Sequence, residues 1–317
     1  MRANEKYVIG LDGGGTKTVA ELFNLEGKVL ADVRGGPSNF QVIGEDKAAE
    51  VILNLCEECC RTAGVVPEDI GAVVAGLTGA GRENDQQRMI EVLNRFAAQR
   101  NLEFHRFVVE SDARIALEGA FSGHTGIIAI AGTGSIVLGK DENGAIYRAG
   151  GWGRIVGDEG SGYAIGREAF RAAARVLDGR LKKSLVFEYL KSEHNLGNQR
   201  AIVDALYKQG FDVASVVPLV LKAAEEKDQP AMDILHQAAD DLLEVIEAVV
   251  KKMRAEGKKK IPLAFVGSLL TNENYYSRVL KRTIHSKLHL VEVHNPEGSP
   301  VKGAGVMGRK MLVAPTD

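Results

Sequence analysis

Long hydrophobic runs are absent from this sequence of 317 residues. No stretch approaches the roughly 18 apolar residues of a membrane-spanning helix, and the polar residues 1–6 do not fit a secretory signal. The formal net charge of -2 gives no electrostatic reason to expect a nucleic acid or a membrane surface as partner. We therefore expect a cytoplasmic protein with no nucleic-acid or membrane partner.

Cysteine is scarce, with only Cys56, Cys59 and Cys60 in the whole sequence. An odd number clustered in one predicted helix does not describe a disulfide framework. No second Cys or His pair lies at the spacing of a zinc site, and H-E-x-x-H is missing. The three thiols fall at helical spacing with Ala48 and Ile52, so we expect them to face the core as small apolar groups.

The commonest phosphate-binding signatures are also missing. A Walker A loop needs Gly-Lys followed by Ser or Thr, and the three Gly-Lys pairs here precede other residues. Gly303, Gly305 and Gly308 match G-x-G-x-x-G, but too near the end of the sequence for a strand–helix–strand unit. We interpret these glycines as close packing of a helix.

A different glycine-rich segment, Asp12-Gly13-Gly14-Gly15-Thr16-Lys17-Thr18, follows an apolar run at 7–11. Successive glycines allow a sharp turn, and their amide groups can point at phosphate oxygens. Hydroxyls of Thr16 and Thr18 and the ammonium of Lys17 would complete a polyphosphate cradle. Asp12 cannot itself bind phosphate, which predicts a divalent cation between them. The alternative is a strained hairpin without a ligand.

The same pattern returns later in the chain. Apolar residues 126–131 lead into Gly132-Thr133-Gly134-Ser135, and another turn follows at 141–144. Gly132 lies 117 residues after Gly15, and Gly144 lies 117 residues after Gly27, because 132 − 15 and 144 − 27 are both 117. Two related halves would let the two glycine turns grip one polyphosphate from both sides. Coincidence between two hairpins is the alternative.

Apolar periodicity predicts the elements around these turns. Strands are expected near 7–11, 17–24, 28–34, 71–77, 106–110, 126–131, 136–140, 145–149, 261–266 and 288–293. Helices are expected at 45–63, 83–100, from Ser111 or Asp112 onward, 160–178, 182–192, 199–209, 213–226, 230–256 and 301–312. Strands and helices alternate through short connections, which is an α/β pattern.

Two further segments carry carboxylates. Asp112 ends an apolar strand where a helix begins, so it is either a helix cap or a general base that accepts the proton of an attacking hydroxyl. Asp158 and Glu159 lie among glycines downstream of Trp152. Carboxylates and an indole suit a polyol, whereas the alternative is a surface loop whose acidic pair caps the next helix.

With these segments in order, the chain resembles the acetate and sugar kinase/Hsc70/actin superfamily. It is most similar to its N-acetylglucosamine kinase branch, which includes the BadF-type ATPases. The resemblance implies ATP and Mg²⁺ as cofactors, with the metal at Asp12. It implies two phosphate motifs and an adenosine motif. Gly267-Ser268 takes the place of the adenosine motif, where a Gly-Gly pair is more usual. The implied nucleotide-binding residues are Gly13, Gly14, Gly15, Thr16, Lys17, Gly132, Thr133, Gly134, Ser135, Gly267 and Ser268.

The same resemblance implies the sugar site. The segment Glu110-Ser111-Asp112-Ala113 looks like the one that carries the family's catalytic aspartate, which makes Asp112 the expected base. The implied sugar contacts are Asn39, Thr78, Gly79, Asp112, Gly151, Trp152 and Asp158.

The fold implied is α/β, with two ribonuclease-H-like (actin-like ATPase) lobes flanking a nucleotide cleft and a large helical insertion in the second. Residues 1–117 with 299–317 would form one lobe, and 118–298 the other. The implied activity is transfer of the γ-phosphate of ATP to the 6-hydroxyl of an amino sugar such as N-acetylglucosamine, by a homodimer. One alternative is a BadF-type ATPase activator, although its cluster-binding cysteines have no counterpart after Cys60. Another is a non-catalytic sugar sensor.

Overall fold

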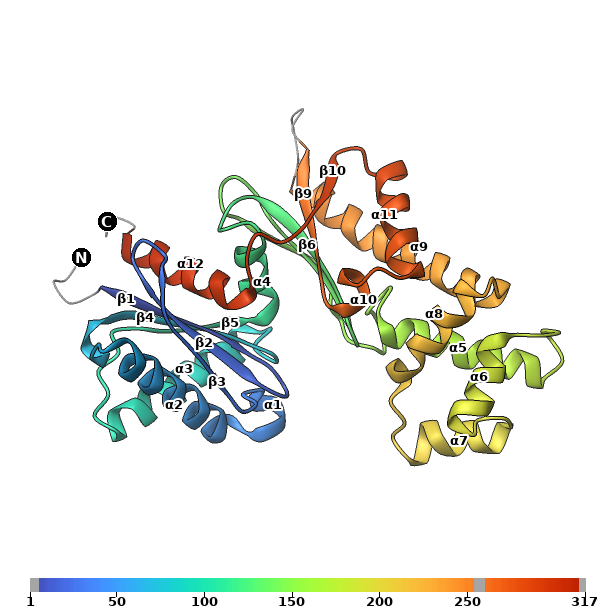
Figure 1. Cartoon of the computed structure of the whole chain (residues 1–317), viewed down its shortest axis with the longest axis horizontal. Helices are drawn as coiled ribbons and strands as arrows, with labels where there is room; N and C mark the ends of the chain where they lie inside the picture. The colour runs from blue at the N-terminus through green and yellow to red at the C-terminus, as the bar shows by residue number, and fades with distance from the viewer. Residues whose placement is uncertain (1–5, 254–259, 314–317) are drawn as a thin grey trace. The chain divides into compact units, whose positions relative to one another are not determined.

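The computed structural model describes residues 6–253 and 260–313. These residues fall into two compact units, the first containing residues up to 124 and from 295 onward, and the second containing 125–294. Each unit is built on one five-stranded sheet with helices packed against it (Figure 1). The α/β fold class predicted from the sequence is confirmed.

The first sheet has the strand order β3-β2-β1-β4-β5. Strands β1, β2 and β3 form an antiparallel meander, whereas β1, β4 and β5 run parallel. The carboxyl ends of β1, β4 and β5 therefore lie at one edge of the sheet, where open α/β sheets usually bind ligands. The bounds are β1 (Tyr7–Gly13), β2 (Thr18–Asn24), β3 (Val29–Gly35), β4 (Ile70–Leu77) and β5 (Phe107–Ser111).

Helices cover both faces of this sheet (Figure 1). On one face α2 (Glu45–Ala63) and α3 (Glu83–Gln99) share a hydrophobic core with the strands, next to the short α1 (Phe40–Ile43) and η1 (Pro67–Asp69). All three cysteines are buried in that core, as predicted from their spacing. On the other face α4 (Asp112–Ala120) packs against α12 (Pro300–Val313).

Glycines permit the close approach of α12 to its neighbours. A Cβ at Gly303 would collide with the carbonyl oxygen of Ile115 in α4, and one at Gly305 would lie 2.5 Å from the ring of Phe23. Gly10 of β1 faces the same helix without room for a side chain. The interpretation of the C-terminal glycine pattern as close helix packing is confirmed.

The second sheet has the strand order β8-β7-β6-β9-β10, which repeats the order and the strand directions of the first. The turns also correspond, because Phe23 pairs with Val29 and Lys140 with Ile146 at the same offset. This topology confirms two related halves. The bounds are β6 (Gly126–Ala131), β7 (Ser135–Lys140), β8 (Ile146–Gly150), β9 (Ile261–Val266) and β10 (Val291–His294).

The two glycine turns differ by one residue. Gly13 pairs with Thr18 across the first turn, but Ala131 pairs with Ser135 across the second. As a result, Asp12 on β1 corresponds in register to Ile130 on β6. The second turn therefore has no carboxylate at its strand end.

Helices supply most of the second unit, and all of those predicted are present. The segment expected at 213–226 starts as a 3-10 turn, and the last residues of the helix expected at 230–256 lie outside the described residues. The bounds are α5 (Gly162–Leu177), α6 (Leu185–His194), α7 (Gln199–Lys208), η2 (Val213–Val216), α8 (Val217–Glu225), α9 (Gln229–Lys252), α10 (Ser268–Thr271) and α11 (Tyr275–Lys287).

Helix α11 was missed by the sequence prediction. Its buried residues Tyr276, Val279 and Leu280 recur at helical spacing, which is the signal that could have revealed it. Tyr276 is fully buried and donates a hydrogen bond to Gly160 O at 2.8 Å.

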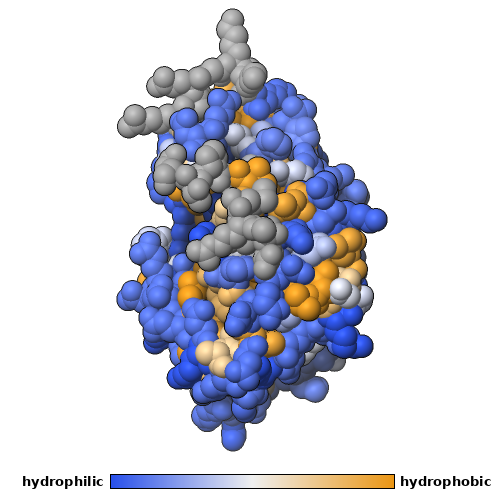
Figure 2. All heavy atoms as spheres, turned by 90° about the vertical axis from the view of Figure 1, so that its left-hand side faces the viewer, coloured by the Kyte–Doolittle hydropathy of each residue, from blue (hydrophilic) through white to orange (hydrophobic). Residues whose placement is uncertain are grey.

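The surface carries no extended apolar belt on the face seen in Figure 2, where hydrophilic side chains surround separate apolar patches. Among the described residues, every helix is too short or too polar to cross a bilayer.

Candidate active site

The first glycine turn is closed by its own backbone. The Gly14 N–H donates to Lys17 O at 3.0 Å, and Gly14 O accepts from Ser38 N–H at 3.1 Å and Asn39 N–H at 3.2 Å. A Cβ at Gly13 would collide with Ser38 Oγ, whereas one at Gly15 would meet nothing within 4 Å. The turn is therefore packed at its base and open at its tip, as an anion cradle requires.

The hydroxyl of Thr18 does not take part in this cradle. Thr18 is fully buried, and its Oγ1 donates to Gly36 O at 2.8 Å and lies 2.8 Å from Ser38 Oγ. The prediction that this hydroxyl helps bind a polyphosphate is wrong, because the first residue of β2 turns its side chain inward. It instead fixes the loop that carries Asn39.

Two carboxylates stand close to this turn. Asp12 is on β1, and Asp112 is the first residue of α4, directly after β5. Burial raises the pKa of Asp12, the charge of Asp112 raises it further, and Lys17 opposes both effects. Ser111, not Asp112, is the N-cap of α4, because its Oγ accepts from Arg114 N–H at 3.1 Å. The N-cap of α4 is therefore Ser111, and the Asp112 carboxylate accepts from one further N–H of the first turn, that of Ala113.

The carboxylate of Asp112 is held at both oxygens. Thr78 Oγ1 donates to Oδ2 at 2.8 Å, and the Ala113 N–H donates to Oδ1 at 2.8 Å. Thr78 directly follows β4, and its own N–H donates to Gly13 O at 2.9 Å. Thr78 thus touches both the glycine turn and the carboxylate.

Asn39 and Gly79 are neighbours at the same edge. Asn39 caps α1, with Oδ1 accepting from Gln41 N–H at 3.1 Å. Gly79 has a φ of +98°, which favours glycine, and a Cβ there would lie 3.3 Å from Asn39 Oδ1. The first unit thus brings together the sequence-predicted residues Asp12, Lys17, Asn39, Thr78, Gly79 and Asp112.

The acidic groups suit a magnesium ion that is shared with a ligand. No group of three or more His, Cys, Asp or Glu residues that could hold a metal occurs in the described part of the chain. Mg²⁺ in phosphate-transfer sites is usually held by one or two carboxylates, waters and substrate phosphates. Asp12 and Asp112 are the two carboxylates available to such an ion, and burial raises the pKa of Asp12 more than the charge of Asp112 does.

In the second unit, the glycine turn is tied to the start of α5. The Gly132 N–H donates to Gly134 O at 2.9 Å, and Gly132 O accepts from Gly162 N–H at 2.8 Å. Ser135 is buried, and its Oγ donates to Glu159 O at 2.7 Å. This side chain therefore joins the turn to the acidic segment.

Asp158 lies against this turn. Its φ of +60° is unusual for a residue other than glycine, and its side chain is buried. A Cβ at Gly134 would come within 2.9 Å of Asp158 Oδ2. Helix α5 is capped by Ser161, whose Oγ accepts from Ala164 N–H at 3.1 Å. The alternative in which the acidic pair caps this helix is wrong.

The glycines before Asp158 are held by a residue that the sequence analysis missed. Arg148 donates to Gly150 O at 3.3 Å and to Gly151 O at 2.5 Å, and both glycines have positive φ. Trp152, which follows them, is 76% exposed. The indole is therefore available to a ligand, and the backbone beside it is fixed.

A cavity of about 460 Å³ adjoins the second glycine turn. Its apolar walls come mainly from α8 and Leu269, and its polar groups from Asp212, Ser215 and Asn272. Gly267, at the end of β9, has a φ of +90°, and a Cβ there would collide with Ala131 O. Three residues that the sequence predicts to bind the nucleotide line this cavity: Gly132, Thr133 and Ser268.

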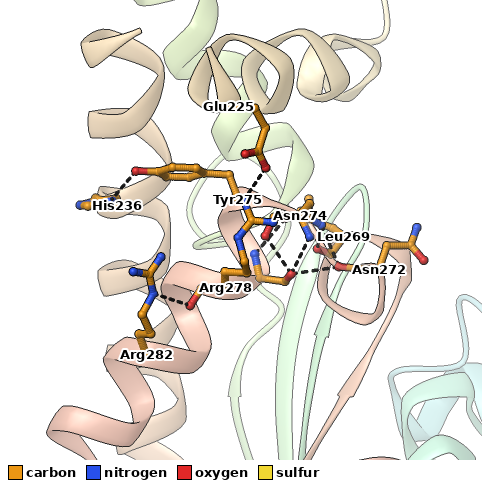
Figure 3. Close-up of polar contacts among 9 residues, drawn as sticks. Glu225, His236, Leu269, Asn272, Asn274, Tyr275, Arg278 and Arg282 are labelled. Carbon is orange, nitrogen blue, oxygen red and sulfur yellow. Dashed lines mark hydrogen bonds and ion pairs between the residues drawn. The ribbon is translucent and has the colours of Figure 1, made fainter. Parts of the chain in front are cut away.

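A capping box shapes one wall of this cavity (Figure 3). Asn274 Nδ2 donates to Leu269 O at 2.9 Å and to Asn272 O at 3.0 Å, and Ser277 Oγ donates to Asn272 O at 2.9 Å. The side chain of Asn272 points away from this network (Figure 3). Asn274 is therefore structural, whereas Asn272 can offer its amide to a ligand. Sequence reasoning identified neither residue.

The two sheets have matching strand order, and a glycine turn joins β1 to β2 in one and β6 to β7 in the other. This is the two-lobed α/β fold of actin-like sugar kinases. The chain belongs to the BadF/BadG/BcrA/BcrD ATPase family, whose profile matches residues 9–308. The family resemblance stated from the motifs is confirmed.

Named relatives cover nearly the whole chain. An N-acetylmuramic acid/N-acetylglucosamine kinase from Clostridium acetobutylicum is 32% identical, over 96% of this chain and 98% of the relative. An N-acetyl-D-glucosamine kinase from Dictyostelium discoideum is 28% identical, with the same coverage. The crystal structure of a candidate N-acetylglucosamine kinase from Chromobacterium violaceum matches with a TM-score of 0.74 and 28% identity, over 96% of this chain and 99% of that one. These relatives support an ATP-dependent amino-sugar kinase.

Proposed function

We propose that this protein transfers the γ-phosphate of ATP to the 6-hydroxyl of an amino sugar, with N-acetylglucosamine as the first candidate. The observation that carries the proposal is Asp112, a carboxylate held at the ligand-binding edge of the first sheet beside the glycine turn. Relatives named as kinases of N-acetylglucosamine support the substrate class.

In this mechanism Asp112 is the general base. It accepts the proton of the sugar hydroxyl while the hydroxyl oxygen forms a bond to the γ-phosphorus and the bond from that phosphorus to ADP breaks. Amide groups of Gly13, Gly14 and Gly15 and the ammonium of Lys17 would stabilise charge on the transferring group. Asp12 would hold Mg²⁺, which neutralises phosphate charge when bound.

The second unit carries its own candidate nucleotide-binding groups. Amide groups of Gly132, Thr133 and Gly134 suit phosphate oxygens, and the adjoining cavity has the mixed apolar and polar lining that a nucleoside needs. Ser268 lines this cavity, and Gly267 directly precedes it after β9. The carboxylate of Asp212 is a candidate partner for ribose hydroxyls.

Each unit carries its own candidate sugar contacts. In the first, Gly79 follows Thr78, which donates to Asp112, and a Cβ at Gly79 would lie 3.3 Å from Asn39 Oδ1. In the second, Arg148 holds the carbonyl group of Gly151, and Trp152 and Asp158 follow along the chain. An exposed indole and a buried carboxylate can cover the apolar face of a hexose and accept from its hydroxyls.

The cysteines argue against the electron-transfer alternative. All three lie in α2 and are buried, and burial raises the pKa of Cys59 and of Cys60 to about 12. Such thiols are poor metal ligands. A colourless protein after anaerobic purification is therefore expected, and a cluster absorbing visible light would contradict this.

An ADP-release assay over a panel of hexoses and amino sugars tests the proposal. N-acetylglucosamine, N-acetylmuramic acid, N-acetylmannosamine and glucosamine belong in the panel, and phosphorus NMR of the product distinguishes 6-phosphate from 1-phosphate. Asp112→Asn should lower kcat by about 10²- to 10⁴-fold while sugar binding persists. Asp46→Asn, an exposed residue of α2, is the matched control. Unchanged turnover in Asp112→Asn, or sugar binding without ADP release in the wild type, would contradict the kinase proposal.

The homodimer stays a prediction, which light scattering on the purified chain would test.

A further inference from the structure

Thr78 occupies the middle of the site in the first unit. It directly follows β4, the strand that lies between β1 and β5. The glycine turn follows β1, and Asp112 follows β5. Thr78 is therefore flanked by the phosphate-binding turn on one side and the carboxylate on the other.

Hydrogen bonds join Thr78 to both neighbours. Its N–H donates to Gly13 O at 2.9 Å, and its Oγ1 donates to Asp112 Oδ2 at 2.8 Å. The other donor to Asp112 is the N–H of Ala113, which is adjacent in the chain and moves with it. Among the described residues, only Thr78 joins the Asp112 carboxylate by a hydrogen bond to the end of a neighbouring strand, β4.

We infer that Thr78 is the positioning residue of the base, and that it sets the place of Asp112 relative to the phosphate-binding turn. This inference rests on the proposed kinase function. A base that transfers its proton during an in-line attack must lie within hydrogen-bond reach of the attacking hydroxyl, and a misplacement of about 1 Å can cost 10²-fold in rate. The Thr78 hydroxyl supplies that constraint.

The hydrogen bond to Asp112 also changes the sugar-binding role that the sequence predicted for Thr78. A hydroxyl group has one proton to donate, and here that proton goes to Asp112. Thr78 therefore does not donate to the sugar. Loss of its hydroxyl should affect the chemical step rather than sugar affinity.

The variants Thr78→Val and Thr78→Ser test this inference. Valine keeps the shape but removes the donor, so kcat should fall by about 10- to 100-fold while the KM values for sugar and ATP change by less than about 2-fold. Serine restores the donor and should recover most of the lost turnover. Thr283→Val is the matched control, because Thr283 donates to a backbone carbonyl in α11, away from the site.

A double-mutant cycle provides the second readout. If Thr78 acts through Asp112, adding Thr78→Val to Asp112→Asn should lower kcat by less than about 2-fold more. Thr78→Ala serves in place of valine if that variant does not fold, as judged by circular dichroism.

Three results would overturn the inference: a raised sugar KM with normal kcat, independent losses in the cycle, or no change in the valine variant. Each leaves the kinase proposal standing if Asp112→Asn is inactive. The kinase proposal fails separately if the wild type releases no ADP with any amino sugar.

Discussion

Asp12 on β1 and Asp112 directly after β5 flank β4, and the charge of Asp112 raises the pKa of Asp12. Burial contributes most to that increase, and Lys17 opposes it. The folded protein therefore holds a proton on Asp12 more tightly than the unfolded chain does. Its contribution to stability is present below the ordinary pKa of 3.8 and is lost as pH rises through the higher folded value.

We predict that Asp12→Asn stabilises the metal-free protein at neutral pH while it lowers activity. Removing the charge relieves both the desolvation and the repulsion by Asp112. Calorimetry should show a higher Tm for the variant at about pH 7, and the difference should shrink toward about pH 4. The variant should also lose the shift in Tm that Mg²⁺ with ADP gives the wild type. A lower Tm for the variant at neutral pH would contradict the conclusion that burial and Asp112 destabilise the charged form of Asp12.

A second prediction concerns Gly134 and Asp158. In Gly134→Ala the added methyl group would lie 2.9 Å from Asp158 Oδ2, so the carboxylate must move. If Asp158 binds sugar, the sugar KM should rise by about 3- to 10-fold through loss of one hydrogen bond. Gly81→Ala, where the added Cβ meets nothing within 4 Å, is the control. A normal KM in Gly134→Ala would remove Asp158 from the sugar site.

The cavity beside the second glycine turn gives a third prediction. The side chain of Asn272 borders the cavity, and its backbone carbonyl is fixed by Asn274 and Ser277. Asn272→Leu should raise the Kd for ADP by about 10-fold, as expected for the loss of one hydrogen bond. Isothermal titration of ADP measures this without sugar. Asn143→Leu, in the exposed turn between β7 and β8, should bind ADP normally, and equal affinities in both variants would argue against this pocket.

Glu21 on β2 provides a prediction about stability alone. It is 9% exposed, and its Oε2 has no hydrogen-bond partner among the described residues. Burial and Asp32 raise its pKa above the ordinary 4.5, while Lys302 opposes them. Because the folded pKa is raised, the stability that Glu21 contributes below pH 4.5 is lost as pH rises through the folded value.

Glu21→Gln should therefore unfold at higher denaturant concentration than the wild type near neutral pH. The gain should disappear as pH falls below about 4.5, where the wild-type carboxyl is protonated in both states. Urea titrations at several pH values measure the difference. Glu50→Gln, an exposed residue of α2, should show no gain, and an equal gain there would contradict the explanation.

Periodicity and repetition made much of this fold predictable. The offset between the two glycine turns indicated duplicated sheets, and the spacing of Cys56, Cys59 and Cys60 indicated burial. Each signal is local, because it depends on neighbours along one strand or one helix. The buried hydroxyl of Thr18 was misassigned for the same reason, since a residue beside a glycine turn can face either side of the strand.

Contacts made across the sheet were not predictable. Thr78 and Asp112 are 34 positions apart and meet only because β4 pairs with β5. Arg148 holds two carbonyl groups, and no side-chain pattern marks a residue whose partners are backbone atoms. Asn272 and Asp212 border one cavity from elements far apart in sequence.

The position of α12 has a consequence for how the protein is made. This helix covers one face of the first sheet, yet it lies after the whole second unit in the chain. During synthesis the first five strands leave the ribosome long before the residues that shield Gly10, Val74 and Ile115. The second unit is continuous and can complete its core first. The N-terminal half of the nascent chain must therefore wait with an apolar face exposed, where a chaperone can bind it.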